Sequence, residues 1–260
     1  MKPRKLLIKL GGTLLDAPES RLRLAREIAQ AAAESNNRIV VVHGGGKQMT
    51  RFLAERGVES RFVNGLRVTT PEIIDAVLKV FAGSVNAELV AAFRAAGVRP
   101  VGLSGLDAGL VDAELLNPEL GQVGKPVRSD ARLLDLLTGN FYLPVVACVA
   151  GDASGAVYNV NADQMAVACA ASFAAGSLVF LTDVEGVRDK DGIICPLLTC
   201  DQAKVLIGEG IATGGMQAKL EAAIDALHKG VHQVLIAPGM LVGVVGKLLA
   251  GQSVGTRLVP

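Results

Sequence analysis

Two lysines stand beside pairs of glycines near opposite ends of this 260-residue chain. Lys9 lies in the strand-like run 5–10 and is followed by Gly11-Gly12, whereas Lys219 follows Gly214-Gly215 at the start of a helical pattern. Glycines leave backbone N–H groups accessible, and ammonium groups beside them add positive charge, which suits a phosphate chain. If the fold brings both lysines to one cleft, we expect phosphoryl transfer there.

A third glycine cluster, Gly44-Gly45-Gly46, follows the apolar run 39–42 and His43 and precedes another helical pattern. Gly46 would present its N–H near a helix N-terminus. His43 alone is more typical of a packed histidine at a strand end than of a catalyst. Neither Gly-x-Gly-x-x-Gly nor Gly-x-x-x-x-Gly-Lys-Ser/Thr occurs in the chain. A Rossmann dehydrogenase and a P-loop enzyme are therefore both disfavoured.

The segment 159–164, Asn-Val-Asn-Ala-Asp-Gln, carries polar residues where a helix should begin. Asn161 followed three residues later by Gln164 fits a helix-capping arrangement. Asn159 and Asp163 are not needed for capping. Asp163 either favours the helix dipole or orients the two lysines through charge-assisted hydrogen bonds.

The composition indicates an aliphatic interior, because half of the residues are hydrophobic and only 3% are aromatic. This is expected of a parallel sheet that helices cover on both faces. The net charge of +1, without a basic stripe interleaved with aromatics, disfavours nucleic acid as a partner. The four cysteines show no metal-ligand spacing, so we expect no protein metal site, and Cys148 and Cys169 should be buried and inert.

One apolar stretch approaches the length of a membrane span, from 165 to 181. Gly176-Ser177 divides it into an alanine-rich helix and a strand, and no signal-peptide pattern precedes the first strand. We therefore expect a cytoplasmic protein that does not enter a membrane.

Short apolar runs alternate with helical patterns, which predicts an α/β fold built as an αβα sandwich with a mainly parallel sheet. The expected strands are 5–10, 39–43, 98–103, 143–149, 178–182 and 233–237. The expected helices lie near 20–35, 47–56, 71–95, 130–138, 162–175, 201–207, 216–229 and 241–250. Glycines and prolines at 107–128 suggest hairpins or a projecting loop. We expect one domain, 1–260, with lobes of about 1–176 and 177–260.

Six motifs, in order, resemble those of the N-acetylglutamate kinases, a branch of the amino acid kinase superfamily. They are Lys9–Gly12, His43–Gly46, Asn64–Thr69, Asn159–Gln164, Thr182–Val187 and Gly215–Lys219. The resemblance covers essentially the whole chain and implies the three-layer amino acid kinase fold. Asn64–Thr69 and Asn159–Gln164 are much closer to this branch than to aspartate, uridylate or carbamate kinases.

The resemblance implies an enzyme that moves the γ-phosphoryl of ATP to the side-chain carboxylate of N-acetyl-L-glutamate, the second step of arginine synthesis. A carboxylate is already ionised near neutral pH, so this nucleophile needs no general base. Positive charges and N–H groups must instead offset the repulsion between two anions. Mg²⁺ would accompany the ATP phosphates.

The same resemblance assigns roles to individual residues. Lys9 and Lys219 would approach the moving phosphoryl group from opposite sides, and Asp163 would hold both. Gly12 and Gly46 would donate backbone N–H groups to it. The acyl amino acid would be held by Arg67, which clamps the α-carboxylate, and by Asn159 and Gly45. The nucleotide would contact Lys9, Gly12, Lys219, Asp183, Val184, Glu185, Gly186, Val187, Arg188, Ile211, Ala212 and Thr213.

The resemblance has one departure and leaves alternatives open. Gly214 stands where some close relatives carry an aspartate. The chain starts almost at its first strand, without the extra helix that resembles a hexamer-forming, arginine-sensing element. We therefore expect a homodimer without arginine feedback, with helix 71–95 as a candidate interface. The acceptor could instead be N-succinylglutamate or a carrier-linked aminoadipate. A non-catalytic nucleotide or amino-acid sensor is disfavoured, because a binding module has no need of two lysines on one aspartate.

Overall fold

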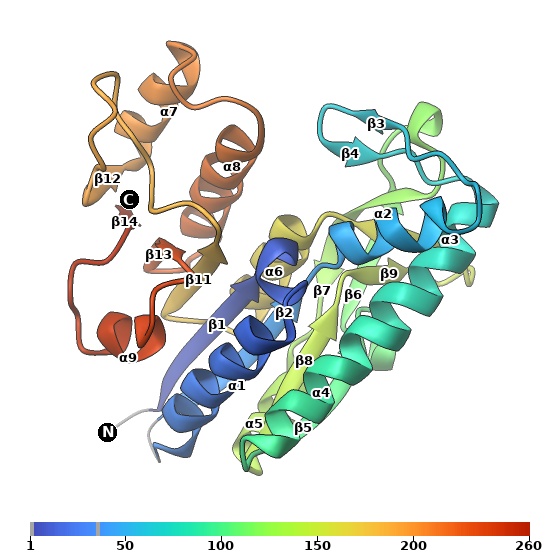
Figure 1. The fold of residues 1–260 in the computed structure, drawn as a ribbon, viewed down its shortest axis with the longest axis horizontal. Helices are drawn as coiled ribbons and strands as arrows, with labels where there is room; N and C mark the ends of the chain where they lie inside the picture. Colours follow the sequence, from blue (N-terminus) through green and yellow to red (C-terminus); the bar gives the residue numbers. More distant parts are fainter. Residues whose placement is uncertain (1–2, 35–36) are drawn as a thin grey trace.

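The computed structural model describes residues 3–34 and 37–260, and its centre is an eight-stranded sheet (Figure 1). Among the described strands, every neighbouring pair in this sheet is parallel except β13 with β14. The predicted αβα fold with a mainly parallel sheet is confirmed. The strand order is β12 (Leu197–Thr199), β14 (Thr256–Val259), β13 (Gln233–Pro238), β11 (Ser177–Thr182), β1 (Arg4–Leu10), β2 (Asn37–His43), β8 (Tyr142–Ala147) and β5 (Arg99–Ser104).

Aliphatic strands fill the middle of this sheet. In β2 and β11 the last five residues are all buried, and β1 is buried from Leu6 onward. Strands that are buried on both faces need such continuous apolar runs. The sheet crosses the expected lobe boundary near residue 176 without a break, because β1 pairs with β11 along five residues, from Leu6 to Leu10.

Helices cover both faces of the sheet (Figure 1). On one face α1 packs against α4 and α9, and on the other α6 packs against α8. The bounds are α1 (Pro18–Ala33), α2 (Gly46–Ala54), α3 (Pro71–Val77), α4 (Asn86–Ala95), α5 (Arg132–Gly139), α6 (Ala162–Ser172), α7 (Cys200–Gly208), α8 (Gly214–His228) and α9 (Val244–Leu249), with short helical turns η1 (Gly12–Leu15), η3 (Asp107–Gly109) and η4 (Pro118–Leu120). The predicted end of the first helix at residue 35 lies outside the described residues.

The predicted helix 71–95 is confirmed, although a π-helical segment, η2 (Leu78–Val85), joins α3 to α4. Thr70 caps its start by accepting a hydrogen bond from the Ile73 N–H at 3.3 Å. By length and composition this helix could cross a membrane, and half of its most apolar window is buried. That buried side packs on α1, β5 and β8, as in a helix that covers a sheet.

Residues 107–128 form a hairpin, which is one of the two structures predicted for this segment, the other being a projecting loop. Its strands β6 (Val111–Leu115) and β7 (Val123–Ser129) are antiparallel and close a small barrel with β9 (Val149–Gly151) and β10 (Val157–Val160). A second, two-residue hairpin consists of β3 (Phe62–Val63) and β4 (Leu66–Arg67). The single strand expected at 143–149 was wrong, because the chain leaves the sheet at Cys148 and β9 joins the barrel.

The cysteine predictions hold. All four thiols are free, and Cys148 and Cys169 are buried. Burial raises the pKa of each of these two thiols to about 12, which keeps both protonated and unreactive near neutral pH. The apolar stretch 165–181 is divided as expected, since α6 ends at Ser172 and β11 begins at Ser177.

Candidate active site

The carboxyl ends of three adjacent parallel strands bring the glycine turns together. Leu10, at the end of β1, lies opposite His43 in β2 and Leu181 in β11. Gly11-Gly12 and Gly44–Gly46 therefore leave the sheet side by side, and a side chain built on Gly12 would begin only 3.4 Å from the Gly46 nitrogen. Ligands of open parallel sheets bind outside this edge.

Asp163 lies between the two lysines that the sequence singled out. Its Oδ1 is 2.6 Å from the Lys9 Nζ, and its Oδ2 is 3.5 Å from the Lys219 Nζ. Asn161 starts α6 as expected, since its Oδ1 accepts hydrogen bonds from the N–H groups of Asp163 at 2.8 Å and Gln164 at 3.3 Å. The structure thus brings an early strand and a late helix to one carboxylate.

Electrostatics keep this carboxylate ionised. Burial by itself would raise the pKa of Asp163, but the positive charges of Lys9 and Lys219 outweigh burial and hold that pKa below its usual value. Only 6% of Asp163 and 7% of Lys9 are exposed, so the pair is screened little by solvent. One carboxylate shared by two ammonium groups leaves a net positive charge, to which an anion can bind.

Arg67, at the end of β4, forms the opposite side of the cleft. Its Nη2 donates to the Thr50 hydroxyl at 2.8 Å and to the Gly46 carbonyl at 3.2 Å, and its Nη1 donates to the Ser60 hydroxyl. Its guanidinium also lies over the Phe62 ring, 4.5 Å from the ring centroid. Within 3–34 and 37–260 no carboxylate pairs with Arg67, so this part of the chain supplies no counter-ion.

A cleft of about 700 Å³ connects Lys9 with Arg67. Besides these two, it is lined by Gly12, Thr13, Asp16, Gly44, Gly45, Gly46, Lys47, Thr50, Arg51, Ala54, Phe62 and Ala162. Sequence reasoning gave Lys47 and Thr50 no role. Helical spacing could have indicated Thr50, which lies one turn after Gly46 and therefore on the same side of α2.

Of the other two residues expected to hold the acceptor, Gly45 lines the cleft, whereas Asn159 lies behind its wall. Asn159 does not line the cleft, and its Nδ2 donates to the Thr69 hydroxyl at 3.0 Å. Thr69 is fully buried and donates to the Arg67 carbonyl at 2.9 Å. Asn159 is therefore joined to the strand that carries Arg67. Gly45 faces the Phe81 ring so closely that a Cβ would begin 2.8 Å from it.

The residues expected to contact a nucleotide divide into two groups. Asp183 accepts hydrogen bonds from the hydroxyls of Thr13 at 3.0 Å and Thr182 at 3.1 Å. Partial burial opposes ionisation of Asp183, but these bonds, its own N–H and the charge of Lys219 hold its pKa below the usual value. In the turn that follows, Val184 is exposed, and Glu185 and Arg188 on either side of Gly186 form an ion pair at 2.6 Å. Thr213 directly precedes α8, and Ile211, two residues earlier, is half-buried.

Val187 and Ala212 form the second group, because both side chains are buried in the core. The Val187 N–H donates to the Thr256 hydroxyl at 2.8 Å, and its carbonyl accepts from the Cys195 N–H at 2.8 Å. In this structure Val187 therefore supports the turn from behind. Its expected contact with a nucleotide stays a prediction and would have to come from the backbone.

His43 is fully buried, as the sequence indicated. Its Nδ1 lies 2.9 Å from the Gly44 carbonyl, and its Nε2 lies 3.0 Å from the Asn86 side-chain nitrogen. The bonding network assigns the proton to Nδ1, since the Asn86 amide donates to Nε2. Burial lowers the pKa of His43 from 6.5 to about 4, so the ring is neutral at physiological pH. His43 supports the glycine turn and does not reach the cleft.

This burial makes stability depend on pH. Unfolded His43 titrates near 6.5, whereas the folded ring takes up a proton only near 4. Above pH 6.5 the histidine is neutral in both states. Below it the unfolded chain gains a proton first, so the free energy of unfolding should fall by on the order of 3 kcal/mol as the pH drops to about 4. Urea unfolding across this range should show the slope, and His43→Gln should flatten it. In the folded protein, a titration near pH 6.5 of the NMR signals assigned to the His43 imidazole would contradict its low pKa.

Comparison with known proteins gives matches over nearly the whole chain. Residues 4–238 match the sequence model of the amino acid kinase family. The chain is similar to the acetylglutamate kinase of Solibacter usitatus (strain Ellin6076), at 61% identity over 255 residues, which cover 98% of this chain and 99% of that one. It is also 45% identical, over 90% of both chains, to the acetylglutamate kinase of Acidobacterium capsulatum.

Two solved structures share the fold. The N-acetylglutamate synthase from Neisseria gonorrhoeae, complexed with coenzyme A and N-acetyl-glutamate, matches with a TM-score of 0.86 at 25% identity. That match covers 100% of this chain and 60% of the synthase chain. The smu.665 protein from Streptococcus mutans UA159 matches with a TM-score of 0.82 at 27% identity, over 98% of both chains.

Proposed function

The chain belongs to the amino acid kinase family, and we propose that it is an acetylglutamate kinase that phosphorylates the side-chain carboxylate of N-acetyl-L-glutamate with ATP in arginine biosynthesis. One structural observation supports this most directly. Lys9 and Lys219 share Asp163 at the edge of a cleft whose far wall carries Arg67, an arginine without a carboxylate partner in the described part of the chain. Such a cleft suits an acceptor with two carboxylates.

The acceptor would lie between Arg67 and the glycine turns. The planar guanidinium of Arg67, fixed by Thr50 and Ser60, would clamp the α-carboxylate. Asn159 would support this wall, and the Gly45 turn would face the rest of the acyl amino acid. The side-chain carboxylate would then point toward Lys9. The synthase that shares this fold was solved with N-acetyl-glutamate, which is consistent with such an acceptor.

Transfer requires the ionised carboxylate to approach an anionic phosphoryl group. No proton has to leave the nucleophile near neutral pH, so the chain needs no general base. Lys9 and Lys219 would neutralise the developing charge from two sides, while the N–H groups of Gly12 and Gly46 would donate to the phosphoryl oxygens. Asp163 would keep both ammonium groups aimed at this point.

The nucleotide would bind on the side of Asp183 and Thr213, in the proposed C-terminal lobe of about 177–260. The proposed N-terminal lobe, about 1–176, would hold the acceptor. Glu185, Gly186 and Arg188 would line the nucleotide side with Val184, Ile211 and the backbone near Ala212.

Mg²⁺ would enter this site bound to ATP and not to ligands from the described part of the chain. In 3–34 and 37–260 no three histidine, cysteine or acidic side chains are grouped to hold a metal ion. Asp163 and Asp183, the carboxylates beside the lysines, already bind ammonium or hydroxyl groups. Mg²⁺ would therefore sit on the ATP phosphates and offset part of their charge. Free thiols favour a reducing compartment, and we place the enzyme in the cytoplasm.

Acceptor specificity tests the proposed function. Purified protein with Mg²⁺ and ATP should phosphorylate N-acetyl-L-glutamate faster than N-succinyl-L-glutamate or a carrier-linked aminoadipate, with ADP release as the measurement. Conversion of the α-carboxylate of N-acetyl-L-glutamate to an amide should raise KM, because Arg67 loses its ionic partner. Preference for another acceptor would assign the enzyme to a different substrate, and no turnover with any acceptor would support a sensor.

The two lysines provide a second test. Lys219→Ala or Lys9→Ala should lower kcat by about 10²–10³-fold, the usual cost of losing one transition-state donor. Lys229→Ala, at the end of the same helix as Lys219, removes an exposed ammonium from outside the cleft and should leave kcat unchanged. Circular dichroism would check that the variants fold. Near-normal kcat in folded Lys219→Ala would remove that lysine from the mechanism.

We also propose a homodimer. The helix from Pro71 to Ala95 buries one side and leaves Leu78 partly exposed, and the neighbouring edge strand β5 has no partner on its outer side within the described sheet. Unpaired strand edges readily pair with another chain. Light scattering of the purified protein should therefore give about twice the chain mass of 26.9 kDa. A mass of one chain, or of six, would contradict the proposal.

A further inference from the structure

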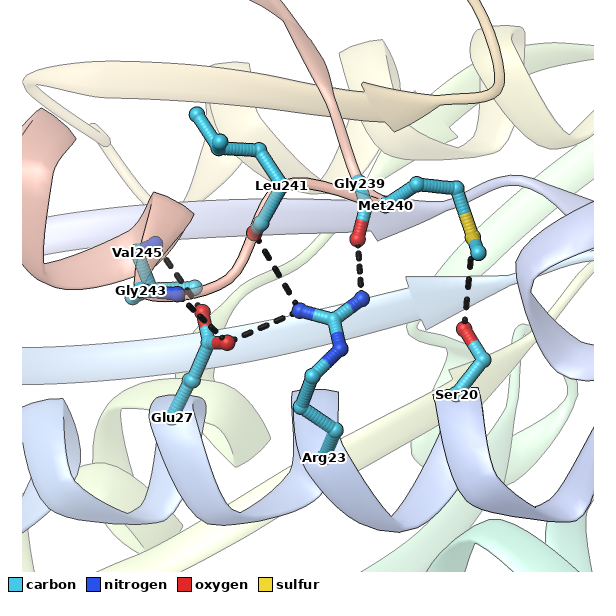
Figure 2. A network of polar contacts seen from close by, with 8 residues as sticks. All are labelled: Ser20, Arg23, Glu27, Gly239, Met240, Leu241, Gly243 and Val245. Carbon is cyan, nitrogen blue, oxygen red and sulfur yellow. Dashed lines mark hydrogen bonds and ion pairs between the residues drawn. The ribbon is translucent and has the colours of Figure 1, made fainter.

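Two charged residues on α1 reach across to the segment that follows β13 (Figure 2). Arg23 and Glu27 lie one helical turn apart, and the Arg23 Nη1 is 2.8 Å from the Glu27 Oε1. Both side chains are mostly buried, with exposed fractions of 23% and 14%. Their partners are backbone groups of residues 239–245. We call Arg23, Glu27 and these backbone groups the α1 latch.

The latch binds polar groups that the local secondary structure leaves free. Glu27 accepts hydrogen bonds from the N–H groups of Gly243 at 2.9 Å and Val245 at 3.3 Å, which stabilises the start of α9. Arg23 donates to the carbonyls of Leu241 at 3.2 Å and Gly239. Figure 2 shows both side chains pointing from α1 toward this segment. Hydrogen bonds to charged groups are stronger than neutral ones, so the backbone is firmly held.

Apolar burial anchors the end of this segment, where Val244 and Val245 are buried in the core, but it contributes little at residues 240–242. Met240 is 61% exposed and Val242 is 70% exposed, so their side chains extend into solvent. The only side-chain contact of Met240 drawn in Figure 2 is a weak one, from the Ser20 hydroxyl to its sulfur at 3.8 Å. The position of residues 240–242 therefore depends mainly on polar contacts of the backbone, including those of Arg23 with Gly239 and Leu241 and that of Glu27 with Gly243.

This segment touches the nucleotide side of the site from behind. The Gly239 N–H donates to the Thr182 carbonyl at 2.7 Å, directly before Asp183. A Cβ on Gly239 would begin 2.2 Å from Leu14, so the segment fits closely against η1. In η1, Thr13 donates to Asp183 at 3.0 Å, one residue after Gly12. Displacement of residue 239 would therefore shift the phosphate-facing turn and Asp183 relative to one another.

We propose that Arg23 and Glu27 are positioning residues for the nucleotide half of the site. They join the part of the chain before residue 176 to the segment after β13, and this contact supports from behind the two turns of Gly12 and Asp183, which follow the paired strands β1 and β11. The inference rests on the proposed function only in taking that half as the ATP side. Neither residue lines the cleft next to Arg67, so acceptor binding should be independent of the latch.

The experiment uses Arg23→Ala, Glu27→Ala and the double variant, with Arg26→Ala as the matched control. Arg26 lies exposed on the same helix and makes none of the latch contacts. Calorimetric titration with Mg²⁺-ADP should show about tenfold weaker binding in each latch variant, because loss of about one aligned hydrogen bond to the phosphates has roughly that effect on affinity. The KM for ATP should rise similarly while the acceptor KM stays within about twofold.

Two further variants separate positioning from general stability. Arg23→Lys keeps one charge-assisted donor and should recover part of the nucleotide affinity, and Glu27→Gln should lose less than Glu27→Ala. The double variant should have about the same ADP affinity as the single variant that binds ADP more weakly, because both residues hold one segment. These milder substitutions also supply the measurement if an alanine variant does not fold.

Unchanged ADP affinity in folded Arg23→Lys and Glu27→Gln, together with unchanged affinity in every alanine variant that folds, would overturn the inference. An equal rise of both KM values would also overturn it, since that pattern indicates general loosening. A wild-type protein that binds ADP but does not phosphorylate N-acetyl-L-glutamate would refute the proposed acceptor and leave the calorimetric test of the latch intact.

Discussion

The sharing of Asp163 by Lys9 and Lys219 is the interaction on which the rest of the structure depends. A buried carboxylate is costly unless it is paired, and here two ammonium groups from distant parts of the chain provide the pairing. Two positive charges on one negative charge leave an excess that water alone would satisfy poorly. Pairing with Asp163 joins β1 and α8 at that point, and the excess positive charge of the two lysines suits a further anion.

The parallel sheet is what makes this meeting possible. β1 lies between β11 and β2, so the carboxyl ends of all three strands open at one edge. The glycine turns leave from that edge, α6 starts beside it, and α8 brings Lys219 from the far side. Each turn contributes backbone N–H groups that are not hydrogen-bonded within the sheet. Backbone as well as side-chain groups can therefore bind a phosphate there.

Sequence reasoning succeeded where the signal is local. The aliphatic strands, the cap at Asn161, the buried His43 and the strand ends next to glycines follow from neighbours within a few residues. The meeting of Lys9 with Lys219 at Asp163 was expected from chemistry and from the family resemblance. Contacts between distant segments, such as Asn159 with Thr69 or the α1 latch, were not predictable, because a periodic pattern within one segment does not show which other segment it meets. The short strands β12 and β14 were overlooked for a related reason, since three or four residues give too little pattern to separate a strand from a loop.

The two lysines are not held equally. Lys9 belongs to a central strand bonded on both sides and stays 2.6 Å from Asp163, whereas Lys219 sits in the second turn of α8 at 3.5 Å and is more exposed. An arriving phosphoryl group could therefore draw Lys219 away from Asp163 far more easily than it could displace Lys9. In the proposed mechanism Lys9 would then be the fixed cation that defines where the reaction happens, and Lys219 would be the cation that follows the charge as it migrates. Inhibitors shaped like the half-transferred group would then gain affinity chiefly through the Lys219 amine.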